Sequence, residues 1–164
     1  MYKRQVKYTD APRWWVSTLL ILNTAAVVLF QVKVSKRSRP LNESFNQYFL
    51  SGFLLAGACL LYASAEGPSA QIASLALVIG MALHVVAELL IAMIHWQISF
   101  DLADPARQGA YYGLWTFGNG LSEIVGPTLV TFALVSLGKP GLALLALMFF
   151  VNTLFYKLIV VSKK

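Results

Sequence analysis

Apolar runs of about 20 residues, the length that a helix needs to cross a hydrocarbon layer of about 30 Å, recur along this chain and constrain its fold most. The chain is 58% hydrophobic and 12% charged over 164 residues. A single soluble core does not hide such an excess of apolar side chains. Backbone in lipid must satisfy its own hydrogen bonds, and the runs lack the alternation typical of barrel strands. We therefore expect an all-α polytopic membrane protein in contact with a lipid bilayer.

The runs predict five transmembrane helices in a single domain that covers residues 1–164. Charged residues, glycines and prolines separate the runs from one another. Residues 33–46 between the first two runs are expected to form a basic cytoplasmic loop. The five expected spans are about 14–32, 47–65, 69–100, 109–137 and 142–161.

Basic residues set the expected orientation, because loops rich in lysine and arginine stay on the cytoplasmic side. The loop after the first span is strongly basic, whereas the turn after the second span, Glu66 to Pro68, has no basic residue. We expect a plasma-membrane protein whose C-terminus is cytoplasmic, and the net charge of +6 is not interpreted as nucleic-acid binding. On this scheme the inside carries Lys33, Lys36, Arg37, Arg39, Arg107, Lys157, Lys163 and Lys164, and the outside carries Lys3, Arg4, Lys7, Arg13 and Lys139.

The basic N-terminus conflicts with this orientation, since such an end favours the cytoplasm. Either the topology is frustrated or Met1 is not the natural start of the membrane domain, and we favour the second interpretation.

Three ionisable residues form one stripe along the third span: His84, Glu88 and His95. An acidic residue at mid-membrane costs about 2.5–3.5 kcal/mol, so such groups usually face a bundle interior or a water-filled path. We interpret Glu88 and His84 as candidate proton or substrate groups and His95 as nearer the inner interface. No metal site is expected, because the two histidines lie three turns apart.

The fourth span places Tyr112, Trp115, Asn119, Glu123 and Gly126 on one face. Asn119 and Glu123 are candidates to line a substrate or proton pathway, with the two aromatic rings as its wall. Core packing is the alternative role of the rings. Pro127 removes a backbone donor and so frees a carbonyl near Glu123. On an adjoining stripe Gly118, Ser122 and Gly126 form an expected packing seam.

Polar and small residues in the other spans have structural and functional interpretations. In the first span Asn23, Thr24 and Gln31 predict either a hydrogen-bonding helix contact or substrate-facing groups. In the second span Gly52, Ala56 and Gly57 are small enough to let a neighbouring backbone approach. Between the third and fourth spans, Asp104 followed by Pro105 predicts an N-cap and a first-turn proline.

No spacing typical of a catalytic site is present, whether for a serine nucleophile, a phosphate loop, haem or zinc. The single cysteine, Cys59, excludes a disulfide framework within the chain. We therefore expect no enzymatic activity, no catalytic residues, no cofactor and no metal.

Two segments, Leu20 to Arg39 and Ile98 to Val130, resemble the major facilitator superfamily, in particular its bacterial drug-exporter-like members. The first is similar to the eighth helix and the basic loop that follows it. The second is similar to the connection between the tenth and eleventh helices, with an acidic-alanine-proline joint and a later Gly-Pro. The matching residues are Asn23, Gln31, Lys36, Arg37 and Arg39 in the first, and Asp101, Ala103, Asp104, Pro105, Arg107, Tyr111, Gly113, Gly126 and Pro127 in the second.

The resemblance implies the last five helices of a transporter whose first seven helices lie elsewhere. It implies proton-coupled export of small molecules or drugs by the complete protein, and inactivity of this chain alone. The partner would be the missing N-terminal half. A different class, a small non-transporting multi-pass protein that assembles with a membrane partner through the fourth span, is the alternative.

Overall fold

The computed structural model describes residues 13–35, 41–66, 69–101 and 103–161. Within these ranges the side chains of residues 13, 16, 34–35, 41–45, 96–101 and 156–161 are not described. The described part consists of five α-helices and one π-helical segment, with no strand. The expected all-α class is therefore confirmed.

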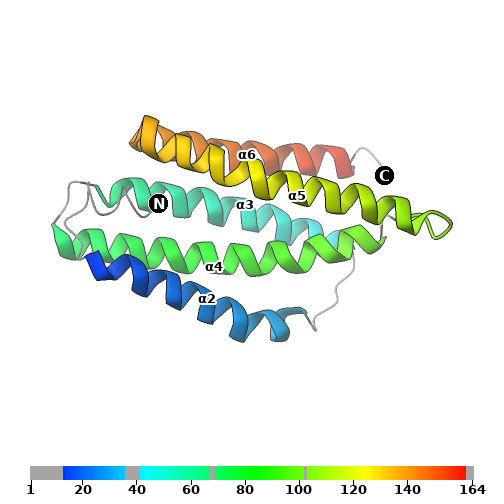
Figure 1. Cartoon of the computed structure of the whole chain (residues 1–164), viewed down its shortest axis with the longest axis horizontal. Coiled ribbons are helices and arrows are strands. Elements are labelled where there is room, and N and C mark those ends of the chain that lie inside the picture. The colour runs from blue at the N-terminus through cyan, green and yellow to red at the C-terminus, as the bar shows by residue number, and fades with distance from the viewer. Residues whose placement is uncertain (1–12, 36–40, 67–68, 102, 162–164) are drawn as a thin grey trace.

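The helices run back and forth as long rods in chain order (Figure 1). They are α2 (Arg13–Ser35), α3 (Leu41–Ser64), α4 (Ala70–Asp101), α5 (Gln108–Phe132) with the π-helical segment η1 (Ala133–Leu137) after it, and α6 (Lys139–Val161).

Three stretches of helix are long and apolar enough to cross a membrane: Asn46–Ser64, Ala70–His95 and Gln108–Leu137. In their described parts α2 and α6 contain shorter apolar stretches, Ser17–Lys33 and Lys139–Phe155. These lengths and compositions are consistent with a membrane protein.

Helix ends differ from the expected spans at two connections. Because α2 continues to Ser35 and α3 already begins at Leu41, the expected basic loop 33–46 narrows to residues 36–40, which lie outside the described residues. The last helix begins at Lys139 rather than 142, and only Gly138, at φ 67°, separates it from η1. Pro140 fits the first turn of α6 because no intrahelical acceptor awaits its missing N–H there.

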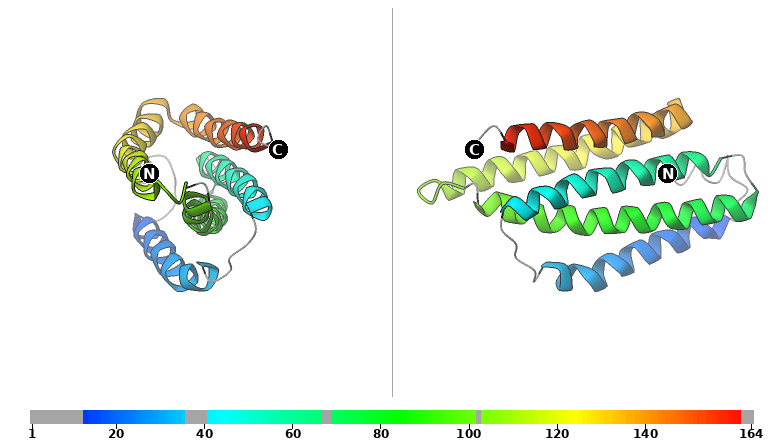
Figure 2. Two further views of the ribbon diagram at one scale, coloured as in Figure 1. Left: turned by 90° about the vertical axis from the view of Figure 1, so that its right-hand side faces the viewer. Right: turned by 180° about the vertical axis from the view of Figure 1, so that it is seen from behind.

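Two apolar clusters pack the helices together toward the end of the bundle where η1 turns into α6. One joins α2, the turn after α3, and α4 through Leu19, Ala65, Ala73, Ala76 and Leu77. The other joins α3, η1 and α6 through Cys59, Ala133, Leu145 and Ala146. Seen end-on in Figure 2 (left), α4 lies centrally, with α3 on one side of it and α2 and α5 on the other.

The helices α3 and α6 approach each other closely at Gly52. A Cβ at Gly52 would collide with Oγ1 of Thr153 and would lie 3.3 Å from the backbone oxygen of Phe149. Nearby, Asn152 Nδ2 donates to Tyr48 Oη across 2.8 Å. The expected close approach at the small residues of this helix is thus confirmed at Gly52, whereas Gly57 makes only ordinary contact with Leu83.

By contrast, α5 is the least packed helix of the described chain. None of its residues is buried. A Cβ added at any of its glycines would meet nothing within 4 Å beyond its own neighbouring turns. Ser122, in the expected seam between Gly118 and Gly126, donates to its own helix at the Gly118 oxygen over 2.9 Å. The seam therefore has no neighbouring helix within the described residues.

Candidate functional site between α4 and α5

A ring contact between His95 and Trp115 joins α4 to α5. The two ring centroids lie 4.5 Å apart at an interplanar angle of 48°, and both residues are half-buried. Apart from this point, α5 is connected to the bundle mainly through η1, which continues from it and packs against α6. His95, expected near the inner interface, thus packs against Trp115 at that level.

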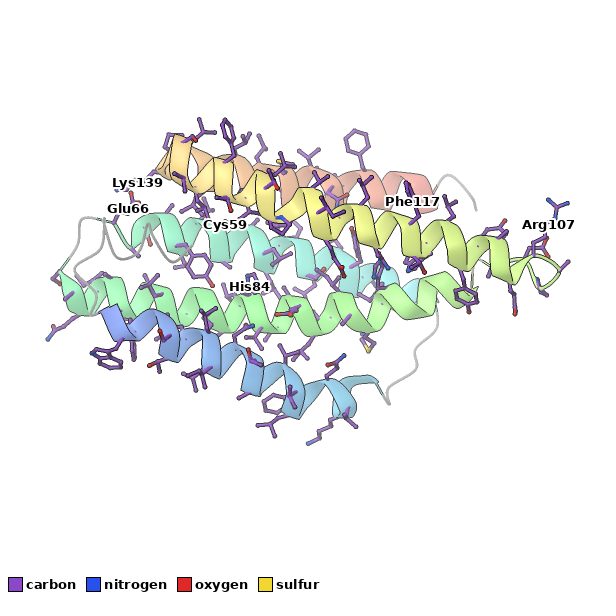
Figure 3. The ribbon with its side chains drawn as sticks, in the orientation of Figure 1. Cys59, Glu66, His84, Arg107, Phe117 and Lys139 are labelled. Atoms are coloured by element: carbon purple, nitrogen blue, oxygen red, sulfur yellow. The ribbon has the colours of Figure 1, made fainter. Side chains whose placement is uncertain are left out.

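Glu88 lies on the face of α4 that is turned toward α5. It precedes His95 by seven residues, so the two side chains leave the helix within about 20° of each other. Unlike His95, Glu88 is exposed, because α5 no longer covers α4 at this level. His84, one turn further along, is half-buried, and Figure 3 shows it projecting from α4 toward the side of α3 and α5.

Glu123 lies on α5 at the same level as Glu88. From the ring contact, Glu88 is seven residues back along α4 and Glu123 is eight residues forward along antiparallel α5, which correspond to about 10.5 and about 12 Å. Glu123 is exposed, and no hydrogen bond or ion pair joins it to another residue of the described chain. We call this level, marked by Glu88 and Glu123, the carboxylate level.

Most residues of the stripe expected on α5 lie on the less exposed face of this helix. Tyr112, Trp115, Asn119 and Gly126 are half-buried, whereas Glu123 is exposed. The opposite face carries large apolar side chains such as Phe117, which is 69% exposed (Figure 3). The helix thus separates a lipid-like surface from a polar and small-residue surface.

The first-span polar residues do not form a buried hydrogen-bonding contact. Thr24 is exposed and donates to the Leu20 oxygen of its own helix over 3.0 Å. Asn23 is half-buried and Gln31 is exposed. Leu19 packs with residues 73–77 of the parallel helix α4, so Gln31, twelve residues later, reaches the level of residues 85–89. A third polar side chain is therefore level with the two carboxylates.

The connection after α4 differs from its prediction. Asp104 is not an N-cap, because α5 begins only at Gln108 and Arg107 precedes it without a side-chain cap. Instead Asp104 Oδ1 accepts from the Ala106 amide over 2.9 Å, and the Asp104 carbonyl accepts from Arg107 N–H. Proline at 105 thus belongs to a turn, and the side chains of Asp104 and Arg107 are exposed.

The remaining predicted motif residues occupy scattered positions. Asp101 ends α4, and its side chain is outside the described part, as is all of Arg37. Gly113 and Pro127 are exposed on α5, which continues through the proline as an α-helix to Phe132. The backbone leaves α-helical geometry at η1, which begins six residues beyond Pro127.

Several structured contacts escaped the sequence analysis. Tyr48, Asn152 and Thr153 link α3 and α6, and Lys139 Nζ donates to the Glu66 oxygen over 3.1 Å, which ties two turns together. Polar residues inside apolar helices were the available signal, but their partners lie 73 and 104 residues away. Comparison with protein-family models, curated proteins and solved structures finds no match.

Proposed function

We propose that this chain is the C-terminal portion of a major facilitator superfamily transporter of the plasma membrane, which exports small molecules or drugs in exchange for protons. The observation that supports this best is the carboxylate level. Glu88 and Glu123 lie at one level on exposed faces of two neighbouring helices that are both long and apolar enough to cross a membrane.

An ionised carboxylate does not remain against hydrocarbon, because each would cost about 2.5–3.5 kcal/mol there. Water, a substrate or more protein must therefore cover these two side chains. A carboxylate that meets water from alternate sides of a membrane can bind a proton on one side and release it on the other. Such a group couples proton entry to the outward movement of a second molecule.

The neighbouring residues suit the binding of a small molecule. His84 lies one turn from Glu88 on α4, while Asn119 lies one turn from Glu123 on α5. Tyr112 and Trp115 supply aromatic surface on the same face. In this proposal the carboxylates carry the proton, Asn119 orients the substrate and the rings contact its apolar part.

In this proposal the chain is inactive alone, and the exposure of the carboxylate level supports this part of the proposal. A transporter must seal its pathway from one side of the membrane at a time, and the described helices leave this level uncovered. The DNA immediately upstream of Met1 provides a first test. An adjoining reading frame with about seven apolar spans would supply the missing half, whereas one without such spans would favour the alternative below.

The decisive experiment measures transport by the complete complex in vesicles with an imposed pH gradient. Glu88→Gln and Glu123→Gln should each abolish proton-driven transport while leaving membrane insertion intact. Glu66→Gln is the matched control, because Glu66 lies in the turn after α3, away from the carboxylate level. Unchanged transport in both span variants would refute proton coupling through this level.

One observation favours a second candidate, a non-transporting protein that assembles with a membrane partner. The glycines of α5 meet no neighbouring helix among the described residues. If assembly is the function, Gly118→Leu should abolish complex formation in detergent, while Glu88→Gln should leave the complex intact.

A further inference from the structure

The helices α2 and α4 pack together at one end and separate toward the other. Leu19 of α2 is buried in a cluster with Ala73, Ala76 and Leu77 of α4. From this contact the two parallel helices diverge along their length (Figure 1), and the view from behind shows the same divergence (Figure 2, right). The contact at Leu19 is thus the packed end of the pair.

Exposure rises along the side of α2 that carries Leu19. Asn23, Ala26, Phe30 and Lys33 follow Leu19 by 4, 7, 11 and 14 residues, which places all four within about 40° of it around the helix. Asn23 and Ala26 are half-buried, Phe30 is 51% exposed and Lys33 is exposed. The side of α2 that faces α4 at Leu19 therefore loses its cover toward Lys33.

The facing side of α4 changes in the same way. His84 and Glu88 follow Leu77 by 7 and 11 residues, within about 20° of it around α4. Leu77 is buried, His84 is half-buried and Glu88 is exposed. The large exposed apolar side chains of α4 lie on the other side of the helix: Ile72, Leu75, Ile79 and Val86. Glu88 is therefore exposed on the packing side of α4 and not on its apolar surface.

Lys33 and Glu88 bring opposite charges to one level of these two facing sides. Leu19 lies level with residues 73–77, so Lys33, fourteen residues later on the parallel helix, lies level with residues 87–91. Neither side chain forms an ion pair within the described residues. We propose that α2 rotates about its contact at Leu19, so that Lys33 pairs with Glu88 and the separated ends of α2 and α4 close.

The charges around Glu88 favour Lys33 as its partner. Among the described side chains, Lys33 is the one lysine or arginine at this level, since Arg107 and Lys139 lie at the two ends of the segment formed by α5 and η1. Glu123 of α5 has the same charge as Glu88, and α3 has no charged side chain in its described part, residues 46–64. A lysine and a glutamate at membrane depth both gain from pairing, because neither charge is stable against hydrocarbon.

This inference takes α2 and α4 to cross a membrane, as the proposed function does, but it concerns the position of α2 and not transport. The test measures distances between two nitroxide labels in the full chain, in phosphatidylcholine vesicles and a Cys59→Ala background. Labels at Val28→Cys and Val86→Cys lie on the outward sides of α2 and α4 toward their separated ends. Labels at Ile21→Cys and Leu75→Cys, near the packed end, form the reference pair.

The distance between the Val28 and Val86 labels should be longer in Lys33→Gln and in Glu88→Gln than in the chain with both charges, because loss of either charge removes the pair. The exchange of the two charges, Lys33→Glu with Glu88→Lys, should restore the shorter distance. Glu123→Gln is the matched control, because it removes the other carboxylate of this level and should leave the shorter distance in place. The reference distance should be the same in all variants.

An equal distance between the Val28 and Val86 labels in the unaltered chain and in both single variants would overturn the inference. A charge exchange that leaves the labels apart would also overturn it, and so would a shorter distance that is lost in Glu123→Gln. A reference distance that changes in either single variant would refute the pivot at Leu19. Transport is read out separately, so failure of proton coupling leaves these distances standing, and an immobile α2 leaves the transport test unaffected.

Discussion

A methyl group at Gly52 should destabilise the bundle through one identifiable collision. The Cβ of Gly52→Ala would overlap Oγ1 of Thr153 and lie 2.9 Å from Thr153 Cβ and 3.3 Å from the Phe149 oxygen. Thr153 is 2% exposed and its hydroxyl already donates to the Phe149 oxygen, so it has no free space to move into. The helices α3 and α6 must therefore separate.

Overpacking of this kind costs about 1–3 kcal/mol of unfolding free energy. Alanine also gains about 0.8–1 kcal/mol over glycine as a helix former, which partly masks the collision. Gly113→Ala on α5 provides the matched control, because it has the same gain and nothing within 4 Å to collide with. The difference between the two variants isolates the collision, and we expect Gly52→Ala to be less stable than Gly113→Ala by about 1–3 kcal/mol.

The assay is reversible unfolding in mixed micelles of a mild detergent and dodecyl sulfate, followed by tryptophan fluorescence and far-ultraviolet circular dichroism. In the double variant with Thr153→Ala the overlapping oxygen is gone but the Cβ contact remains, so the collision should be relieved only in part. Equal stability of the Gly52 and Gly113 variants would refute the close α3–α6 contact, and so would full additivity in the double variant.

Three further predictions concern stability in the same assay. Gly141→Ala should destabilise by more than Gly52→Ala, because its Cβ meets backbone atoms of Ala133 that no side-chain rotation can move; a smaller effect would contradict the tight η1–α6 turn. Asn152→Ala should cost about 0.6 kcal/mol, the average for a hydrogen bond between membrane helices, and a stabilising effect would contradict its contact with α3. Trp15→Phe should cost less than about 1.5 kcal/mol or even stabilise, because it removes a buried Nε1–H that has no partner within the described residues, and a larger loss would imply a bond to that nitrogen.

Long apolar runs were sufficient to predict the helices, because their length and composition depend on local sequence alone. The expected close contact was confirmed at Gly52, but the glycines of α5 meet no neighbouring helix among the described residues, so the spacing of small residues alone does not identify a contact. Helix ends were less predictable. Asp104 and Pro105 have the composition of a helix start, but Asp104 bonds the Ala106 amide in a turn, and this choice depends on where α5 packs.

The relation between the two carboxylates could not be predicted from sequence. Periodicity places Glu88 and Glu123 on faces of their own helices, but their common level follows from the His95–Trp115 contact between helices. Periodicity also grouped Glu123 with Trp115, yet the structure leaves Glu123 exposed while Trp115 packs on His95. Tertiary contacts of this kind set the register, and no local pattern encodes them.

The depth of the carboxylate level in a bilayer tests the proposed account most directly. Nitroxide labels at Glu88→Cys and Glu123→Cys, in a Cys59→Ala background, report depth through their relative accessibility to oxygen and to a water-soluble nickel complex. The account predicts equal depths for the two labels within about one helical turn, or about 5.4 Å, near the bilayer centre. Labels at Glu66→Cys and Asp104→Cys should report opposite aqueous surfaces. A surface depth for either span label, or depths that differ by more than two turns, would contradict the account.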